Sequence, residues 1–184
     1  MTQASIRHAI TTRRFTAQLP VAEYIARFRR ADYFLSLCRE CQNFGRRYGC
    51  PPFDYDVVER MQHYSTATII GVQIVPEEKN LPLSIAQELM APVIRDLMEE
   101  LLEEEKRTSG LSFGIAGGCT LCGDIPCARI TDEPCRHPDR VRPSLESYGF
   151  DLAKTSEELF NAPILWSRNE YIPNYLMLIC SIFN

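Results

Sequence analysis

The sequence predicts a single α+β domain with a small mixed sheet, flanking helices and cysteine-rich loops. Residues 67–75 form a nearly continuous, β-branched apolar run, which is typical of a central buried strand. Residues 175–183 form a second apolar run of strand length. Between them, apolar residues recur at helical spacing over residues 86–101. With 184 residues, 45% of them hydrophobic and 24% charged, one core over residues 1–184 accounts for the length and the composition.

The first third of the chain is predicted to hold an irregular start, helices and a loop. Residues 1–20 show no clear periodicity, and we expect them to be loosely ordered or partly extended. Apolar spacing then allows helix over residues 21–40, and a helix over residues 31–40 would present Cys38 from its last turn. The run Cys50-Pro51-Pro52 predicts an irregular loop, after which the two prolines can open a helix to about residue 64.

The strongest helix signal lies in the middle of the chain. Ser84 and Gln87 have the spacing of a capping box just before the apolar pattern. Pro92 should kink or divide this helix, and Gly110 should end it. The acidic residues 99–105 are expected on its solvated face. The remaining expected elements are a strand over residues 111–116, short helices over 144–148 and 152–160, and a C-terminal strand over 175–183.

Seven of the eight cysteines fall in two short windows. The first window is Cys38-x2-Cys41-x8-Cys50, and the second window is Cys119-x2-Cys122-x4-Cys127-x7-Cys135. Together they span 30 of the 184 residues, so chance would place only one or two cysteines there. Core packing needs no such clustering, whereas thiolates around a metal do, because short loops bring soft ligands together at little entropic cost. The sequence therefore predicts that all seven cysteines are metal ligands.

The spacing leaves the identity of the metal open. Four thiolates spaced as in the second window can hold zinc or a [4Fe–4S] cluster. We expect one or two such iron–sulfur clusters, with zinc, or disulfides and free thiols, as the alternatives. Arginine beside a cluster can donate to sulfur and offset negative charge, so Arg136, His137 and Arg140 are candidate cofactor-binding residues. The alternative for these residues is a solvated, partly ion-paired loop.

The eighth cysteine, Cys180, lies in the apolar C-terminal run and is expected to be a core thiol. The alternative makes Cys180 the fourth ligand of the first window, which supplies only three. A third possibility leaves one iron at Cys38, Cys41 and Cys50 open to water, substrate or His63. We also expect the two windows to lie side by side, because both sit at the ends of secondary-structure elements.

Net charge and hydropathy indicate which classes of partner and which cellular compartment to expect. A formal net charge of −4 argues against nucleic-acid binding, which usually requires a basic surface. The longest apolar run is too short to span a bilayer, and residues 1–22 hold no secretory apolar core. Clustered cysteines are more often ligands than disulfides in a reducing compartment. We therefore expect a cytoplasmic protein with a redox partner protein and with no nucleic-acid or membrane partner.

Three segments resemble a known family. They are Cys38-RE-Cys41-QNFGRRYG-Cys50-Pro51-Pro52, the GGC-x2-C motif at residues 117–122, and CRHP-x3-RPSLE-x-YG-x-D at residues 135–151. In this order they resemble the predicted metal-binding family called domain of unknown function 2284. The resemblance implies iron–sulfur clusters, a cytoplasmic location and the seven window cysteines as ligands, but no particular reaction. The chain departs from the pattern at Cys127, because the gap after Cys122 is longer than we expect in relatives.

Three functions are compatible with these observations. The first is electron transfer, or a redox accessory role, by a protein that carries [4Fe–4S] clusters. The second is an enzyme that binds its substrate at an open iron in the first window, helped by Arg46 or Arg136. The third is a zinc-stabilised interaction module without catalysis.

Overall fold

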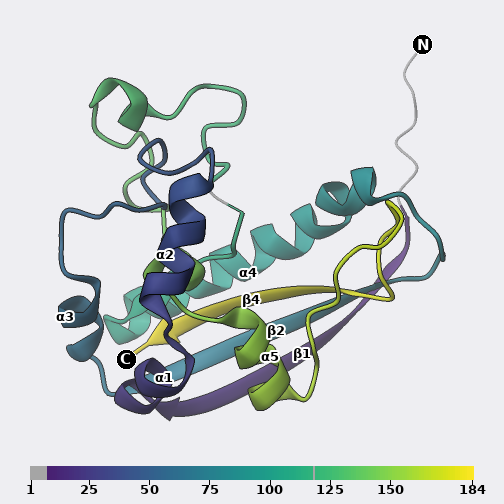
Figure 1. The fold of residues 1–184 in the computed structure, drawn as a ribbon, viewed down its shortest axis with the longest axis horizontal. Helices are drawn as coiled ribbons and strands as arrows, with labels where there is room; N and C mark the ends of the chain where they lie inside the picture. Colours follow the sequence, from purple (N-terminus) through teal and green to yellow (C-terminus); the bar gives the residue numbers. More distant parts are fainter. Residues whose placement is uncertain (1–7, 118) are drawn as a thin grey trace.

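A four-stranded sheet and five α-helices make up the part of the chain that the computed structural model describes, residues 8–117 and 119–184 (Figure 1). The strands are β1 (Ile10–Pro20), β2 (Thr66–Pro76), β3 (Leu111–Phe113) and β4 (Leu176–Phe183). The helices are α1 (Val21–Phe28), α2 (Ala31–Glu40), α3 (Val57–Gln62), α4 (Ala86–Thr108) and α5 (Leu152–Phe160). Short 3-10 helices are η1 (Leu83–Ile85), η2 (Ala128–Thr131) and η3 (Glu146–Tyr148). This arrangement confirms the α+β class.

The strands lie in the order β1-β2-β4-β3, and each named pairing is antiparallel. The sheet formed by the described residues is thus antiparallel rather than mixed. The reason is visible at the end of β1, where Pro20 lies opposite Thr66. The excursion through α1, α2 and α3 leaves the sheet and re-enters it at the same end, so β2 must run back along β1. A parallel neighbour would need a crossover to the other end.

The central strands β2 and β4 are largely buried on both faces. Their side chains point alternately to the two sides, and helices cover each side. One face packs against α4 in a cluster of Ile70, Val72, Ile74, Leu97, Leu101, Leu178, Cys180 and Ile182. The other face packs against α1, α5 and η3 in an aromatic-rich cluster that includes Tyr24, Phe28, Phe113, Tyr148, Phe150, Phe160 and Phe183. Figure 1 shows α4 behind the sheet and both α1 and α5 in front of it.

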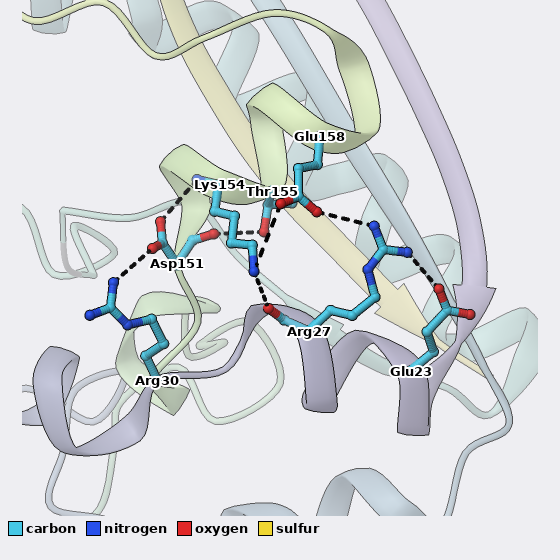
Figure 2. Close-up of polar contacts among 7 residues, drawn as sticks. All are labelled: Glu23, Arg27, Arg30, Asp151, Lys154, Thr155 and Glu158. Carbon is cyan, nitrogen blue, oxygen red and sulfur yellow. Dashed lines mark hydrogen bonds and ion pairs between the residues drawn. The ribbon is translucent and has the colours of Figure 1, made fainter.

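Polar contacts between α1 and α5 hold the corner from which α2 leaves the core (Figure 2). Arg27 of α1 pairs with Glu158 of α5 at 3.1 Å, and Lys154 Nζ donates to the Arg27 carbonyl at 2.8 Å. Arg30, just before α2, lies 3.7 Å from the Asp151 carboxylate. Such exposed pairs contribute little stability individually, but together they fix the relative position of three helices.

Helix α2 stands away from the sheet and is attached at its base. None of its side chains is buried. The Arg30 N–H donates to the Gly149 carbonyl at 2.8 Å, directly before the helix begins. Gly149 has a φ of +90°, and a Cβ there would lie 2.7 Å from the Ala31 Cα, so the approach requires glycine. The contact sets the direction of α2 and leaves its far end, with Cys38, outside the core.

Two boundaries in the first third of the chain differ from the sequence predictions. Residues 10–20 are extended, which is one of the two predicted alternatives, but they are not loosely ordered, because they pair with β2 along its whole length. Residues 1–7 lie outside the described residues. Helix α3 begins at Val57 rather than at the two prolines. Asp56 sets this start, since its Oδ1 accepts from the N–H groups of Val58 and Glu59 at 2.7 and 3.0 Å.

The middle of the chain also differs in detail. Ser84 lies in η1 and makes no cap, so the predicted capping box does not form. Pro92 does not divide helix α4, because the packing of the helix on the sheet outweighs one lost hydrogen bond. Ser109, not Gly110, adopts the left-handed conformation after the helix, with a φ of +53°. Strand β3 spans three residues. Within the described ranges, no helix combines the length and apolarity that a bilayer crossing requires.

Candidate metal centre

The first window follows α2, as predicted. Cys38 lies in the last turn of α2, and Cys41 caps the helix, with its N–H donating to the Cys38 carbonyl at 3.0 Å. Cys50 lies at the end of the next loop, where its N–H donates to the Arg47 carbonyl at 3.0 Å. Cys38 and Cys50 are partly buried and Cys41 is exposed. The window therefore presents three thiols around the free end of one helix.

The second window is an irregular loop between β3 and η3. Two successive turns shape its start, because the Gly123 N–H donates to Thr120 at 3.0 Å and the Ile125 N–H donates to Cys122 at 3.1 Å. Cys127 is the N-cap residue, directly before η2. All four thiols of this window are partly buried.

Side chains of each window bond to the backbone of the other, so the two windows share one end of the molecule (Figure 1). Arg129 donates to the carbonyls of Arg47 and Cys50 at 2.8 and 2.6 Å. It also donates to the Pro52 carbonyl. In return, Arg47 donates to the Cys119 carbonyl. These contacts confirm the prediction that the windows lie side by side.

The end of the second window is anchored to α4 by a largely buried ion pair. The Arg142 Nε donates to both oxygens of Glu105, at 3.0 and 2.8 Å, and the Ser112 N–H donates to the same carboxylate at 2.9 Å. The side chains of Arg142 and Glu105 are 16% and 18% exposed. Glu105 is therefore not on the solvated face that we expected. The first window lies against this anchor, because a Cβ on Gly49 would be 3.2 Å from the Arg142 carbonyl oxygen.

The thiols divide electrostatically into a group of three and a group of four. Burial, followed by the thiols of Cys41 and Cys38, raises the pKa of Cys50 to about 11. Burial also raises the pKa of Cys119, and the thiols that add to this shift are the other three of the second window. Burial, with a smaller contribution from the neighbouring thiols, thus disfavours the thiolate form of Cys50 and Cys119. A bound metal cation removes that penalty, because it stabilises the deprotonated ligand.

Two of the three candidate cofactor-binding residues direct N–H groups at sulfur. The His137 backbone N–H lies 3.4 Å from Cys135 Sγ. Arg136 Nη1 lies 4.0 Å from Cys122 Sγ and donates to the Pro126 carbonyl at 2.8 Å. Arg140 is exposed, and its backbone N–H donates to His137 at 3.1 Å. The structure therefore brings Arg136 and His137, but not the Arg140 side chain, to the thiols among the contacts of the described residues.

The seven thiols fit a soft metal by their chemistry, although they do not converge. None of the eight cysteines, all of which are described, forms a disulfide. Among the described residues, no three His, Cys, Asp or Glu side chains meet in an arrangement that could hold a metal ion. The donor set is thus present in two groups, and ligand side chains would have to turn inward on binding.

Cys180 is separate from both groups. It is fully buried on the α4 face of the sheet. Burial raises its pKa to about 12, and the charged groups that influence it are Arg14 and Glu100. This confirms that Cys180 is a core thiol. His63, the other candidate for an open iron, is exposed at the end of α3.

Sequence reasoning missed one acidic residue near the first group. The pKa of Cys38 is raised mainly by burial, then by Cys41, and then by Glu146 in η3. Its own pKa is raised to about 7 by burial. Its Oε2 is buried and has no hydrogen-bond partner within the described structure. The only sequence signal was its position in the RPSLE segment, which gives no hint of burial.

Comparison with known proteins adds one result. A family profile described as a predicted metal-binding protein, DUF2284, matches residues 27–180. Neither the curated proteins nor the solved structures include a significant match. The matched segment contains both windows and most of the described fold. The chain therefore belongs to the DUF2284 family of predicted metal-binding proteins.

Proposed function

We propose that this protein binds one or two [4Fe–4S] clusters through its seven window cysteines and exchanges electrons with a partner protein. The observation that carries the proposal is that two distant segments, one with three cysteines and one with four, meet at one end of the molecule. Thiolates are soft donors that suit iron–sulfur clusters and zinc. A cluster bound here would supply one-electron redox chemistry.

The surroundings of the thiols support iron–sulfur binding. Arg136 and the His137 N–H approach sulfur atoms of the second window. Hydrogen bonds and positive charge at sulfur favour the reduced, more negative state of a cluster and raise its potential. Arg136 and His137 are therefore the residues that we propose tune a cluster in the second group.

The same end of the molecule suits contact with a partner protein. Exposed apolar side chains lie on α2 and on the second window, namely Tyr33, Leu37, Ile125 and Ile130, which are 46–61% exposed. Apolar side chains close to a redox centre allow a partner to approach within electron-transfer distance. Unpaired thiols persist in a reducing compartment, which supports a cytoplasmic location. We propose that this partner is a protein, and that the chain binds neither nucleic acid nor a membrane.

Anaerobic purification followed by metal and sulfide analysis tests the proposal. We expect iron and acid-labile sulfide, together with brown charge-transfer absorption that bleaches on reduction. Serine substitution of Cys119, Cys122, Cys127 or Cys135 should remove the centre of the second group. Cys180→Val is the matched control and should keep all the iron. Zinc without sulfide would instead identify an interaction module, and full metal content in all four serine variants would refute the ligand assignment.

A second candidate function is favoured by the composition of the first group. Cys38, Cys41 and Cys50 supply three thiols, and Cys180 is too deeply buried to be the fourth. A metal held by three protein ligands keeps a position for an external ligand. An enzyme that binds substrate at the first group is therefore the alternative to pure electron transfer.

A further inference from the structure

A cavity is lined by residues that are neighbours of the first group in the chain. Its volume is about 390 Å³, and its walls come from α2, the loop around Pro51, the start of α3, and η3 with its neighbours. This is within the size range of small-molecule sites. Arg39, which lines the cavity, stands between Cys38 and Cys41 in the chain, and Pro51 follows Cys50. A ligand in the cavity would therefore sit next to the residues that present all three thiols.

Two arginines give the cavity a positive wall. Arg29 is partly buried, and burial lowers its pKa. Its Nε donates to the Tyr148 carbonyl at 2.8 Å, whereas its two terminal nitrogens have no hydrogen bond within the described residues. Arg39 supplies the second guanidinium. An unsatisfied, partly buried guanidinium fork is a good donor to a carboxylate or a phosphate.

The carboxylate that lines the cavity offsets only part of this charge, because Asp56 acts on Arg29 but is one carboxylate beside two guanidinium groups. Asp56 Oδ1 is engaged in capping α3, where it accepts from the N–H groups of Val58 and Glu59. These hydrogen bonds hold the pKa of Asp56 below its usual value. The lining thus holds two guanidinium groups and one ionised carboxylate, and this excess of one positive charge favours an anionic ligand.

The remaining walls are aromatic. The Phe53 ring centroid lies 5.2 Å from those of Tyr55 and Tyr148, and all three residues line the cavity with Phe44. The Tyr148 hydroxyl donates to the Tyr55 hydroxyl at 2.9 Å. Tyr55 thus keeps its own proton, which it can donate to a ligand. Flat apolar walls with a few convergent polar donors select a planar body with a polar head.

We propose that this cavity binds a small aromatic anion, such as an aryl carboxylate or aryl phosphate, with its head at Arg29 and Arg39 and its ring among Phe53, Tyr55 and Tyr148. Binding would place this anion near the first group. The binding itself does not depend on the proposed function; only an effect of the anion on a metal at the first group rests on it. The inference thereby names the ligand class of the alternative enzymatic role.

Calorimetric titration of the metal-loaded, full-length protein tests the inference. Benzoate and phenyl phosphate are the two probes, and the tighter of the two identifies the preferred head group. Inorganic phosphate lacks the ring and benzyl alcohol lacks the charge, so we expect each to bind at least tenfold more weakly. Arg29→Met and Arg39→Met should each weaken binding about tenfold or more, as expected for loss of a hydrogen bond between charged groups. Arg95→Met, on exposed α4 surface, is the matched control and should bind as the unmodified protein does.

The outcomes separate this inference from the proposed function. Arg39 is exposed, so Arg39→Met keeps the test valid even if Arg29→Met fails to fold. Equal affinity of both arginine variants and the unmodified protein would overturn the site. Phosphate binding as tight as phenyl phosphate would overturn the aromatic selectivity. If the anaerobically purified protein contains no iron and still binds benzoate saturably, the cavity is supported and the cluster is refuted. Iron–sulfur signals with no binding of either aryl anion would do the reverse.

Discussion

Replacing Arg142 by methionine should destabilise the domain by about 3 kcal/mol. The substitution leaves the Glu105 carboxylate, whose side chain is 18% exposed, without its cation. Breaking a buried ion pair from one side costs about 3 to 5 kcal/mol, because an unpaired charge stays buried. We expect the lower end of that range, since Ser112 still donates to Glu105 from its backbone N–H and its hydroxyl. Such a loss is a large part of a typical stability of about 5 to 15 kcal/mol.

Urea unfolding of four metal-free proteins measures this effect: the unmodified chain, Arg142→Met, Glu105→Gln with Arg142→Met, and Arg107→Met. The double variant should recover most of the loss, because glutamine leaves no charge and still accepts from Ser112. Arg107→Met is the control, since Arg107 and Glu104 are 71% and 36% exposed and their pair should contribute less than about 1 kcal/mol. If Arg142→Met lowers the free energy of unfolding no more than Arg107→Met does, the Arg142–Glu105 pair does not anchor the second window.

Three further predictions follow from individual residues. The pKa of Glu146 is raised from 4.5 to about 7, so the native state holds a proton that the unfolded state releases. The stabilisation that this proton gives is complete below the unfolded pKa of 4.5 and is lost as the pH rises through about 7. The free energy of unfolding, measured with urea, should therefore fall by up to about 3 kcal/mol over this pH interval, and Glu146→Gln should abolish the fall. Iodoacetamide should label the other seven thiols of the native metal-free protein but not Cys180, whose pKa is about 12 and which is fully buried; mass spectrometry showing eight adducts would contradict this. Arg129→Lys should speed amide exchange at Cys50 but not in β2, because lysine lacks the fork that holds three carbonyls; unchanged exchange at Cys50 would exclude that role.

The periodic parts of the chain could be predicted from the sequence. The helix over residues 31–40 has the same bounds as α2, and the two apolar runs became β2 and β4 within a residue of their predicted ends. These elements are predictable because burial of a helix or strand face leaves a periodic pattern of apolar residues in the local sequence. The position of Cys38 in the last turn of α2 followed from that helix alone.

The parts that depend on distant residues could not be predicted. The acidic run at residues 99–105 gives no sign that Arg142, 37 residues beyond Glu105, returns to pair with it. The strand at residues 10–20 lacks a clean alternation because it lies at the edge of the sheet and is mostly exposed. The cavity near the first group is formed by Arg29, Phe53 and Tyr148 only after three segments meet.

The hydrogen bonds that join the two windows place an unusual constraint on sequence divergence. Arg129 and Arg47 both donate to main-chain carbonyl oxygens of the opposite window. Every amino acid carries such an oxygen, so substitutions at the accepting positions leave these bonds intact. Selection on this contact therefore acts on the donors alone. Across homologues, we expect arginine to persist at positions 47 and 129.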